Sequence, residues 1–238
     1  ATTPVSEQVP PSLSTTTTTI APSATTRPST TTGRTAETAA PVWTAARAEG
    51  RLAVFATPRS DRPFRTLERT TILGTPTVVF VLDATEDWLK VMVPGRPNGQ
   101  TGWVRQADVV MYEVGTRAAI DLSDRTITVF EGETKIFETS VGIGSPAAPT
   151  PTGLFFITDA VRITNPNGPW GPYAFGLSAR SDTVTEFNGG DGIIGVHGTN
   201  RPNSIGEAQS LGCVRLPNDV MLELSELLSV GSPVTIEA

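Results

Sequence analysis

Short apolar runs rich in β-branched residues, each ended by glycine, proline or aspartate, recur from Leu52 to the end of the chain. Such runs predict strands joined by turns. One amphipathic helix pattern starts at Pro217 and continues through the apolar residues up to Leu228. We therefore expect a mainly β protein with one C-terminal helix. Its strands are expected at 52–56, 77–82, 88–93, 102–105, 117–122, 126–131, 135–141, 154–158, 192–196 and 233–237.

The composition changes sharply near residue 41. Residues 1–40 contain 14 Thr, 5 Pro and 5 Ser but no aromatic residue, so they cannot bury enough apolar surface to offset chain entropy. We predict a disordered Thr/Pro/Ser-rich linker at 1–40, a small β domain at 41–114 and a β-rich domain at 115–238. Residues 159–192 are too broken by Pro, Gly and Asn to predict a regular element.

Charge and composition exclude several classes of function. The formal net charge is −6, and residues 115–238 carry 7 Lys and Arg against 14 Asp and Glu, so no basic patch is available for nucleic acid. The sequence shows neither a bilayer-spanning apolar run nor a signal-peptide start. We expect an exported protein of the cell envelope whose signal or anchor is not present in this chain.

The only histidine and the only cysteine lie close together in the sequence, in Gly195-Val-His197-Gly198-Thr-Asn and Ser210-Leu-Gly212-Cys213-Val-Arg215. An adjacent imidazole can convert a thiol into a nucleophilic thiolate. Glycine allows backbone N–H groups to approach a substrate carbonyl, and Gly212 and Cys213 are the candidate donors to an oxyanion. Each residue also has a structural interpretation, as a core histidine, a buried thiol or a solvated arginine.

These two motifs resemble the signature of the YkuD-type L,D-transpeptidases, bacterial cell-wall enzymes with a cysteine nucleophile. The resemblance covers about residues 115–238. It implies that Cys213 attacks the substrate, that His197 is the base and that the Gly198 carbonyl orients the imidazole. One position departs from the pattern: the family usually has histidine where this chain has Leu211.

The resemblance also implies a substrate and a reaction. We expect a peptidoglycan L,D-transpeptidase that forms cross-links through a cysteine acyl-enzyme on tetrapeptide stems, acts as a monomer and needs no metal or other cofactor. Arg215 is the candidate for binding a substrate carboxylate, and the Pro/Gly-rich stretch around Trp170 is either a wall of the cleft or a packed surface loop. Further candidate substrate-binding residues are Ser210, Thr199, Asn200 and Tyr173. Two alternatives remain, a sortase-like cysteine transpeptidase and a catalytically inactive wall-binding protein.

A second, weaker resemblance lies in the preceding region. Trp88-Leu89-Lys90-Val91 and Gly102-Trp103-Val104-Arg105, joined through a turn at Asn98-Gly99, resemble bacterial SH3-like domains. The resemblance implies a small barrel that either contacts wall material or only positions the neighbouring domain.

Overall fold

The computed structural model describes residues 42–187 and 190–238. The predicted linker at 1–40 lies outside these residues. The described residues all belong to one compact unit of the chain. They form a mainly β structure with a single α-helix near the C-terminus, which confirms the predicted fold class. We refer to residues 42–114 as the N-terminal β region and to residues 115–238 as the C-terminal β region.

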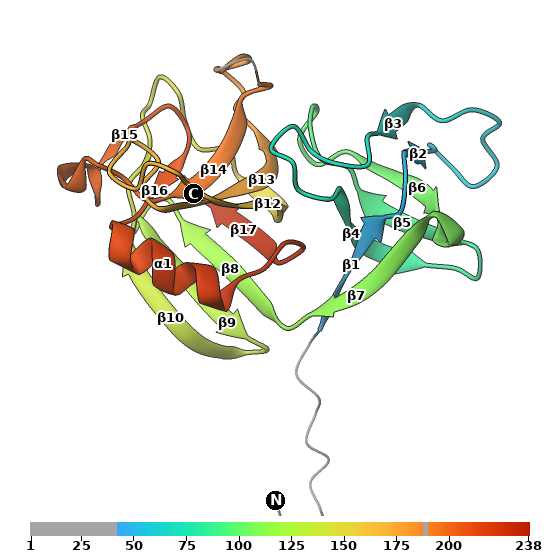
Figure 1. The fold of residues 1–238 in the computed structure, drawn as a ribbon, viewed down its shortest axis with the longest axis horizontal. Helices are drawn as coiled ribbons and strands as arrows, with labels where there is room; N and C mark the ends of the chain where they lie inside the picture. Colours follow the sequence, from blue (N-terminus) through green and yellow to red (C-terminus); the bar gives the residue numbers. More distant parts are fainter. Residues whose placement is uncertain (1–41, 188–189) are drawn as a thin grey trace, which may run out of the picture. The chain divides into compact units, whose positions relative to one another are not determined.

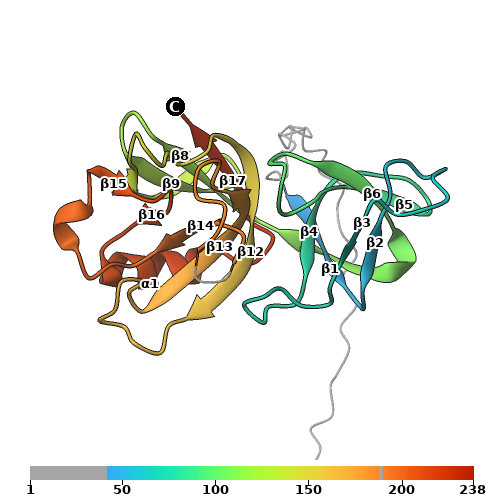
Figure 2. The same cartoon turned by 90° about the horizontal axis from the view of Figure 1, so that it is seen from above.

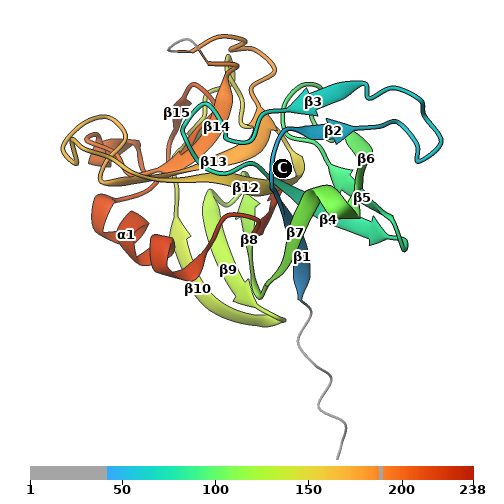
Figure 3. The same cartoon turned by 45° about the vertical axis from the view of Figure 1, so that its right-hand side comes forward.

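The N-terminal β region is built on an antiparallel five-stranded sheet with the order β6-β5-β4-β1-β7. Small aliphatic residues fill its core, and Gly99 turns the chain between β5 and β6 with a positive φ of 72°. Figure 3 shows the two-stranded β2–β3 sheet at the edge of this region. The SH3-like character of the region stays a prediction. Its elements are β1 (Trp43–Ala48), β2 (Leu52–Val54), β3 (Arg65–Leu67), β4 (Val78–Ala84), β5 (Trp88–Met92), β6 (Thr101–Arg105), a 3-10 turn (Gln106–Asp108) and β7 (Val109–Val114).

The C-terminal β region contains an eight-stranded sheet with the order β10-β9-β8-β17-β12-β13-β14-β16 (Figure 1). Two neighbouring pairs, β8–β17 and β14–β16, are parallel, and the other neighbours are antiparallel. Its strands are β8 (Thr116–Asp121), β9 (Thr126–Glu131), β10 (Thr134–Ser140), β11 (Ile143–Gly144), β12 (Gly153–Arg162), β13 (Tyr173–Arg180), β14 (Ile193–His197), β15 (Ala208–Ser210), β16 (Val214–Arg215) and β17 (Pro233–Glu237).

Helix α1 (Asn218–Leu227) begins directly after Pro217, whose fixed φ suits the start of a helix. Its buried residues Met221 and Leu224 join the same apolar core as Phe155 of β12 and Phe175 of β13. Among the described residues, no helix has the length and apolarity needed to cross a membrane. The helix thus covers one face of the sheet that positions the motif residues.

The expectation that residues 159–192 lack a regular element is wrong. Strand β12 continues to Arg162, and β13 lies between β12 and β14, as Figure 2 shows. Strand β13 is buried through Phe175, Gly176, Leu177, Ser178 and Ala179. A strand buried on both faces shows no alternation of polar and apolar residues, and here small residues also dilute its β propensity.

Candidate active site

The parallel pairing of β14 with β16 brings the histidine and cysteine motifs together. In this pair Val196 lies opposite Val214, and His197 lies opposite Arg215. Cys213 directly precedes β16, so its side chain lies beside Gly195, whose N–H donates to Cys213 Sγ over 3.4 Å. The sheet therefore brings His197 and Cys213 together although they are 16 residues apart in the sequence.

Gly195 separates the imidazole from the thiol. A Cβ atom at this position would lie 3.6 Å from His197 Cδ2 and 3.8 Å from Cys213 Sγ. The ring and the sulfur thus lie on the same side of the strand, next to one glycine. Without a side chain at Gly195, the space between them stays open to a reacting group.

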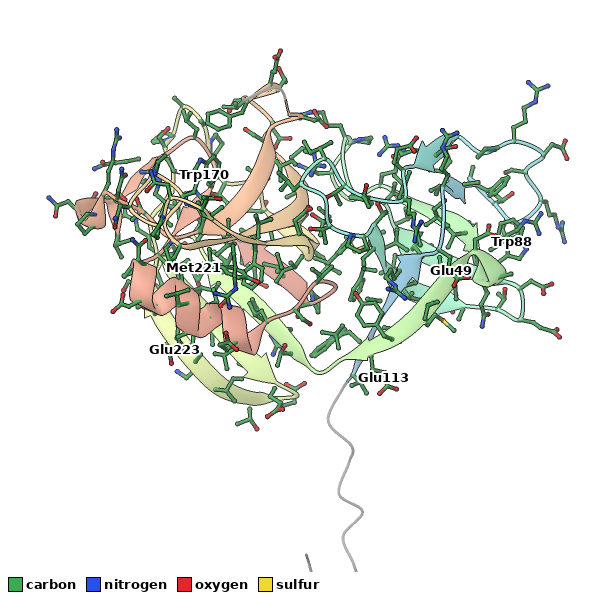
Figure 4. The ribbon with its side chains drawn as sticks, viewed as in Figure 1. Glu49, Trp88, Glu113, Trp170, Met221 and Glu223 are labelled. Atoms are coloured by element: carbon green, nitrogen blue, oxygen red, sulfur yellow. The ribbon has the colours of Figure 1, made fainter. Side chains whose placement is uncertain are left out.

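His197 is held in one orientation. Its Nδ1 lies 2.6 Å from the Gly198 carbonyl oxygen, the contact that the resemblance implies. A carbonyl only accepts hydrogen bonds, so Nδ1 carries the proton and Nε2 of the neutral ring is free to accept one. The Trp170 ring lies over the imidazole with 4.6 Å between ring centroids, and Figure 4 marks its place in the loop before β13.

Burial keeps both reacting groups neutral. The pKa of His197 falls from 6.5 to about 4, mainly because burial disfavours the charged imidazolium. Burial likewise raises the pKa of the Cys213 thiol, and this effect outweighs the Gly195 N–H and the nearby Arg215 charge, which both favour the thiolate. At neutral pH the resting pair is therefore a thiol and an imidazole, not a preformed ion pair.

The loop before the cysteine is shaped by its own hydrogen bonds. The Ser210 hydroxyl donates to the Cys213 carbonyl over 2.6 Å and accepts the Gly212 N–H over 3.1 Å. Gly212 has a φ of 113°, and a Cβ there would lie 2.9 Å from Ile194 Cδ1, so only glycine fits.

Two sequence expectations change as a result. The Gly212 N–H already donates to the Ser210 hydroxyl. Our expectation that it is a free donor to an oxyanion is therefore wrong. Ser210 is 2 % exposed and shapes the loop instead of facing substrate. The structure gives no acceptor for the Cys213 N–H among the residues it describes, which leaves this group as the candidate oxyanion donor.

The cysteine and histidine line one pocket of about 210 Å³. Arg215 and Leu211 also line it, and Leu211 is 55 % exposed. The Nε of Arg215 is buried and has no hydrogen-bond partner among the residues that the structure describes. The remaining lining residues are Pro169, Trp170, Ser181, Val184, Phe187, Gly192, Ile193 and Ile194. Trp170 and Pro169 thus make the loop before β13 one wall of the pocket.

Three other sequence candidates lie outside the pocket. Thr199 is buried, and its N–H and hydroxyl are bonded within the protein to Asn218 and Arg201. Asn200 is exposed and does not line the pocket. Tyr173 packs edge-on against Phe175, with 5.4 Å between ring centroids. These contacts indicate structural roles in the loop and the core.

The sequence analysis did not identify Asn218, which connects two loops next to the pocket. Asn218, at the start of α1, accepts the Thr199 N–H over 2.8 Å and donates to the Pro166 carbonyl over 3.3 Å. It therefore ties the loop after His197 to the loop that carries Trp170. No short motif marks such a contact, because its partners are 19 and 52 residues away.

The residues described by the structure contain no group of three or more His, Cys, Asp or Glu side chains placed to hold a metal ion.

The fold and the site define a β-sheet protein in which a buried histidine and a partly buried cysteine line one small pocket. The model of the YkuD family, the L,D-transpeptidase catalytic domain, matches residues 115–236. The chain belongs to this family.

Two Bacillus proteins agree with this assignment. A Bacillus licheniformis protein named as the L,D-transpeptidase YkuD is 32% identical over 146 residues, which cover 61% of this chain and 73% of that protein. Its Bacillus subtilis counterpart is 30% identical over 151 residues, covering 61% and 84% of the two chains. The NMR structure of the catalytic domain of an Enterococcus faecium L,D-transpeptidase is 23% identical, with a TM-score of 0.40, and covers 51% of this chain and 95% of that domain.

Proposed function

We propose that this protein is an exported peptidoglycan L,D-transpeptidase that cross-links tetrapeptide stems through an acyl-enzyme on Cys213. The observation that carries the proposal is the placement of Cys213 Sγ and the His197 ring on one side of Gly195, within one pocket. Membership of the L,D-transpeptidase family supports the choice of peptidoglycan stem peptides as substrate.

In the first half-reaction, Cys213 Sγ attacks the carbonyl carbon that follows the L-centre of the donor stem. His197 Nε2 takes the thiol proton as the S–C bond forms, because its partner nitrogen is fixed by Gly198. The tetrahedral intermediate collapses with loss of the C–N bond, and the imidazolium gives its proton to the departing D-alanine amine. The stem is then held as a thioester.

In the second half-reaction, a side-chain amine of another stem attacks the thioester carbon. The resemblance implies that this amine is on the D-centre of diaminopimelate. The imidazole accepts the amine proton and returns it to the leaving thiolate, which restores both neutral groups. The Cys213 N–H stabilises the oxyanion in both halves, and a single donor of this kind contributes about 3–4 kcal/mol.

Arg215 is the group best placed to bind a carboxylate of the donor stem. It follows Cys213 by two residues, lines the same pocket and has a buried Nε without a protein partner. A guanidinium offers a planar pair of donors that suits a carboxylate. Charge neutralisation by such a substrate would also ease formation of the imidazolium at His197.

The two alternatives predict different chemistry. A sortase-like enzyme would cleave a sorting peptide, and an inactive wall-binding protein would bind peptidoglycan without forming a thioester. The N-terminal β region could contact wall material under either of the wall-related interpretations. The location in the cell envelope and a monomeric state are parts of the same proposal.

The test is acylation of the intact protein. We expect a carbapenem to add its mass to the wild type at Cys213, and we expect release of D-alanine from a tetrapeptide stem. Cys213→Ala should lose both, and His197→Gln should retain the fold but acylate slowly. Binding of peptidoglycan without any mass shift would favour the inactive binder, and D-alanine release by Cys213→Ala would refute the nucleophile.

A further inference from the structure

One turn of the N-terminal β region is bonded to the segment that forms a wall of the active-site pocket. This turn connects β5 with β6 and contains Arg96 and Asn98. The wall segment consists of residues 181–187 and 190–192, between β13 and β14, and contributes Ser181, Val184 and Gly192 to the pocket. The turn contacts the wall segment near both ends of that segment.

Asn98 binds the end of β13 as a neighbouring strand would. Its Nδ2 donates to the Arg180 carbonyl and its Oδ1 accepts the Arg180 N–H, both over 2.8 Å. The side-chain amide therefore satisfies both backbone groups of the residue directly before the wall segment. Because both bonds come from one planar amide group, they fix the position and the orientation of the Arg180 backbone relative to Asn98.

Arg96 binds the wall segment at two points, Val184 near its start and Asp191 near its end. Its Nε donates to Asp191 Oδ1 over 2.9 Å, and its Nη2 donates to the Val184 carbonyl over 3.4 Å. Arg180 also reaches Asp191, with 3.4 Å between Nε and Oδ2. One carboxylate thus joins an arginine from the turn to an arginine from β13.

The turn itself is held from its own region. Arg65 of β3 donates to the Pro94 carbonyl over 3.0 Å and also to the Arg96 carbonyl. The Gly95 N–H donates to the Ser178 carbonyl of β13 over 3.2 Å. The turn is therefore held by Arg65 of its own region and bonded to β13 of the C-terminal β region.

The wall segment leads directly to the thiol. Ser181 N–H donates to the Gly192 carbonyl over 2.9 Å and closes the base of the segment, while the Ser181 hydroxyl accepts the Val184 N–H over 3.0 Å. The next residue, Ile193, lies with its carbonyl 4.0 Å from Cys213 Sγ. A shift of the segment would therefore change the pocket beside the nucleophile.

We infer that Arg96 and Asn98 are positioning residues for the proposed acyl transfer: from the N-terminal β region they fix the wall segment, residues 181–187 and 190–192, beside the pocket. They touch neither Cys213 nor His197, so their effect passes through the wall segment. The kinetic test of this inference depends on the proposed function, because it measures catalytic activity. The structural test depends only on the contacts described above.

The kinetic test compares Arg96→Ala and Asn98→Ala with the wild type in D-alanine release from a tetrapeptide stem. If the wall segment contacts the stem without taking part in bond making, as we propose, KM should rise about tenfold while kcat changes by less than about twofold. Alkylation of Cys213 by iodoacetamide should keep its wild-type rate. Arg96→Lys, which can still pair with Asp191, should recover part of the lost affinity.

The structural test is hydrogen exchange and needs no activity. Both alanine variants should raise amide exchange about tenfold in the wall segment and leave α1 and β12 unchanged. Arg51→Ala is the matched control, since Arg51 pairs with Glu68 inside the N-terminal β region. It should change neither exchange in the wall segment nor KM.

The outcomes separate the two proposals. A wild type that is never acylated refutes the proposed function, and the exchange measurement still decides the positioning role. Unchanged exchange in both variants, or an increase spread over the whole C-terminal β region, would overturn the positioning role. So would an unchanged KM in an active enzyme.

Discussion

His197 stays neutral in the folded protein at any pH near neutrality because the protein buries it, at 4 % exposure, next to Trp170 and Arg215. A neutral imidazole with a protonated Nδ1 can take a proton at Nε2, which is what the proposed role as general base requires. In the proposed reaction the thiol therefore loses its proton only as it attacks the substrate, because the resting cysteine is not a thiolate.

This burial predicts a pH dependence of stability. The unfolded imidazole takes up a proton near pH 6.5, whereas the folded one does so only near pH 4. Between these values the unfolded state binds more protons, so the contribution of His197 is complete above pH 6.5 and is lost as the pH falls toward 4. The loss amounts to roughly 3 kcal/mol.

The measurement is the free energy of unfolding by urea between pH 4 and 7.5, for the wild type and for His197→Gln. The carboxylates titrate in both proteins, so the difference between the two curves reports His197 alone. A constant difference across this range would show that His197 titrates equally in both states.

The second prediction for a single residue concerns the effect of Leu211 on the reactivity of the Cys213 thiol. It lines the pocket beside Cys213, and leucine offers the thiolate neither a hydrogen bond nor a charge. We expect Leu211→His to speed alkylation of Cys213 near and below neutral pH by up to about tenfold, since one pKa unit corresponds to about 1.4 kcal/mol. Leu211→Phe, which adds a ring without a charge, is the matched control. Coincident pH profiles of the wild type and the histidine variant would show that position 211 does not tune the thiol.

At the scale of elements, the Thr-Pro-Thr-Gly run before β12 supports the nucleophile loop. The Thr150 hydroxyl accepts the Gly144 N–H and donates to the Gly212 carbonyl, each over 2.9 Å. Thr150 is 4 % exposed, so water cannot replace these bonds without a rearrangement. The loop that presents Cys213 is thus tied to the loop that follows β11.

We therefore expect Thr150→Val to lower the free energy of unfolding by about 1–3 kcal/mol, because two buried backbone groups lose their partner while the shape is kept. Thr150→Ser retains the hydroxyl and should cost less. Urea unfolding of the three proteins measures both effects. A loss in Thr150→Ser that is larger than the loss in Thr150→Val would show that the methyl group contributes more than the two hydrogen bonds of the hydroxyl.

The sequence contained enough to predict the local elements but not the long-range contacts. Runs of β-branched residues marked most strands, Asn98-Gly99 marked a hairpin, and Pro217 marked the helix start. The central strand β13 was missed because burial on both faces removes alternation, and Gly176 and Ala179 carry little β propensity.

The same limit applies to the site. The two motifs pointed to Cys213 and His197, because unusual residues beside glycine stand out in a single sequence. They could not reveal that Ser210 already uses the Gly212 N–H, which depends on the turn that the loop adopts. The bonds from Asn98 to Arg180 join residues 82 positions apart, and no local pattern encodes such a pair.

At the scale of the whole described molecule, the two β regions share apolar packing as well as polar bonds. Phe80 of β4 and Phe156 of β12 stack with 6.1 Å between ring centroids, and both are buried together with Met92. The Tyr112 hydroxyl of β7 donates to the Val230 carbonyl over 3.0 Å. Such packing couples the stability of the regions, so we expect residues 42–238 to unfold in one cooperative transition.

Phe80→Ala tests this coupling. Removing a buried phenylalanine costs about 3–5 kcal/mol, and here the cavity would open between the regions, where it weakens their mutual support. We expect calorimetry to show one transition for the wild type and two for the variant, with the N-terminal β region melting first because its core holds fewer large side chains.

Phe55→Ala is the matched control, since Phe55 packs on Trp88 within the N-terminal β region with 5.3 Å between ring centroids. It should lower the melting temperature and keep a single transition. Should Phe80→Ala prove insoluble, Phe80→Leu makes a smaller cavity and should broaden the transition in the same direction. A single sharp transition in both Phe80 variants would show that the shared aromatic packing does not couple the two regions.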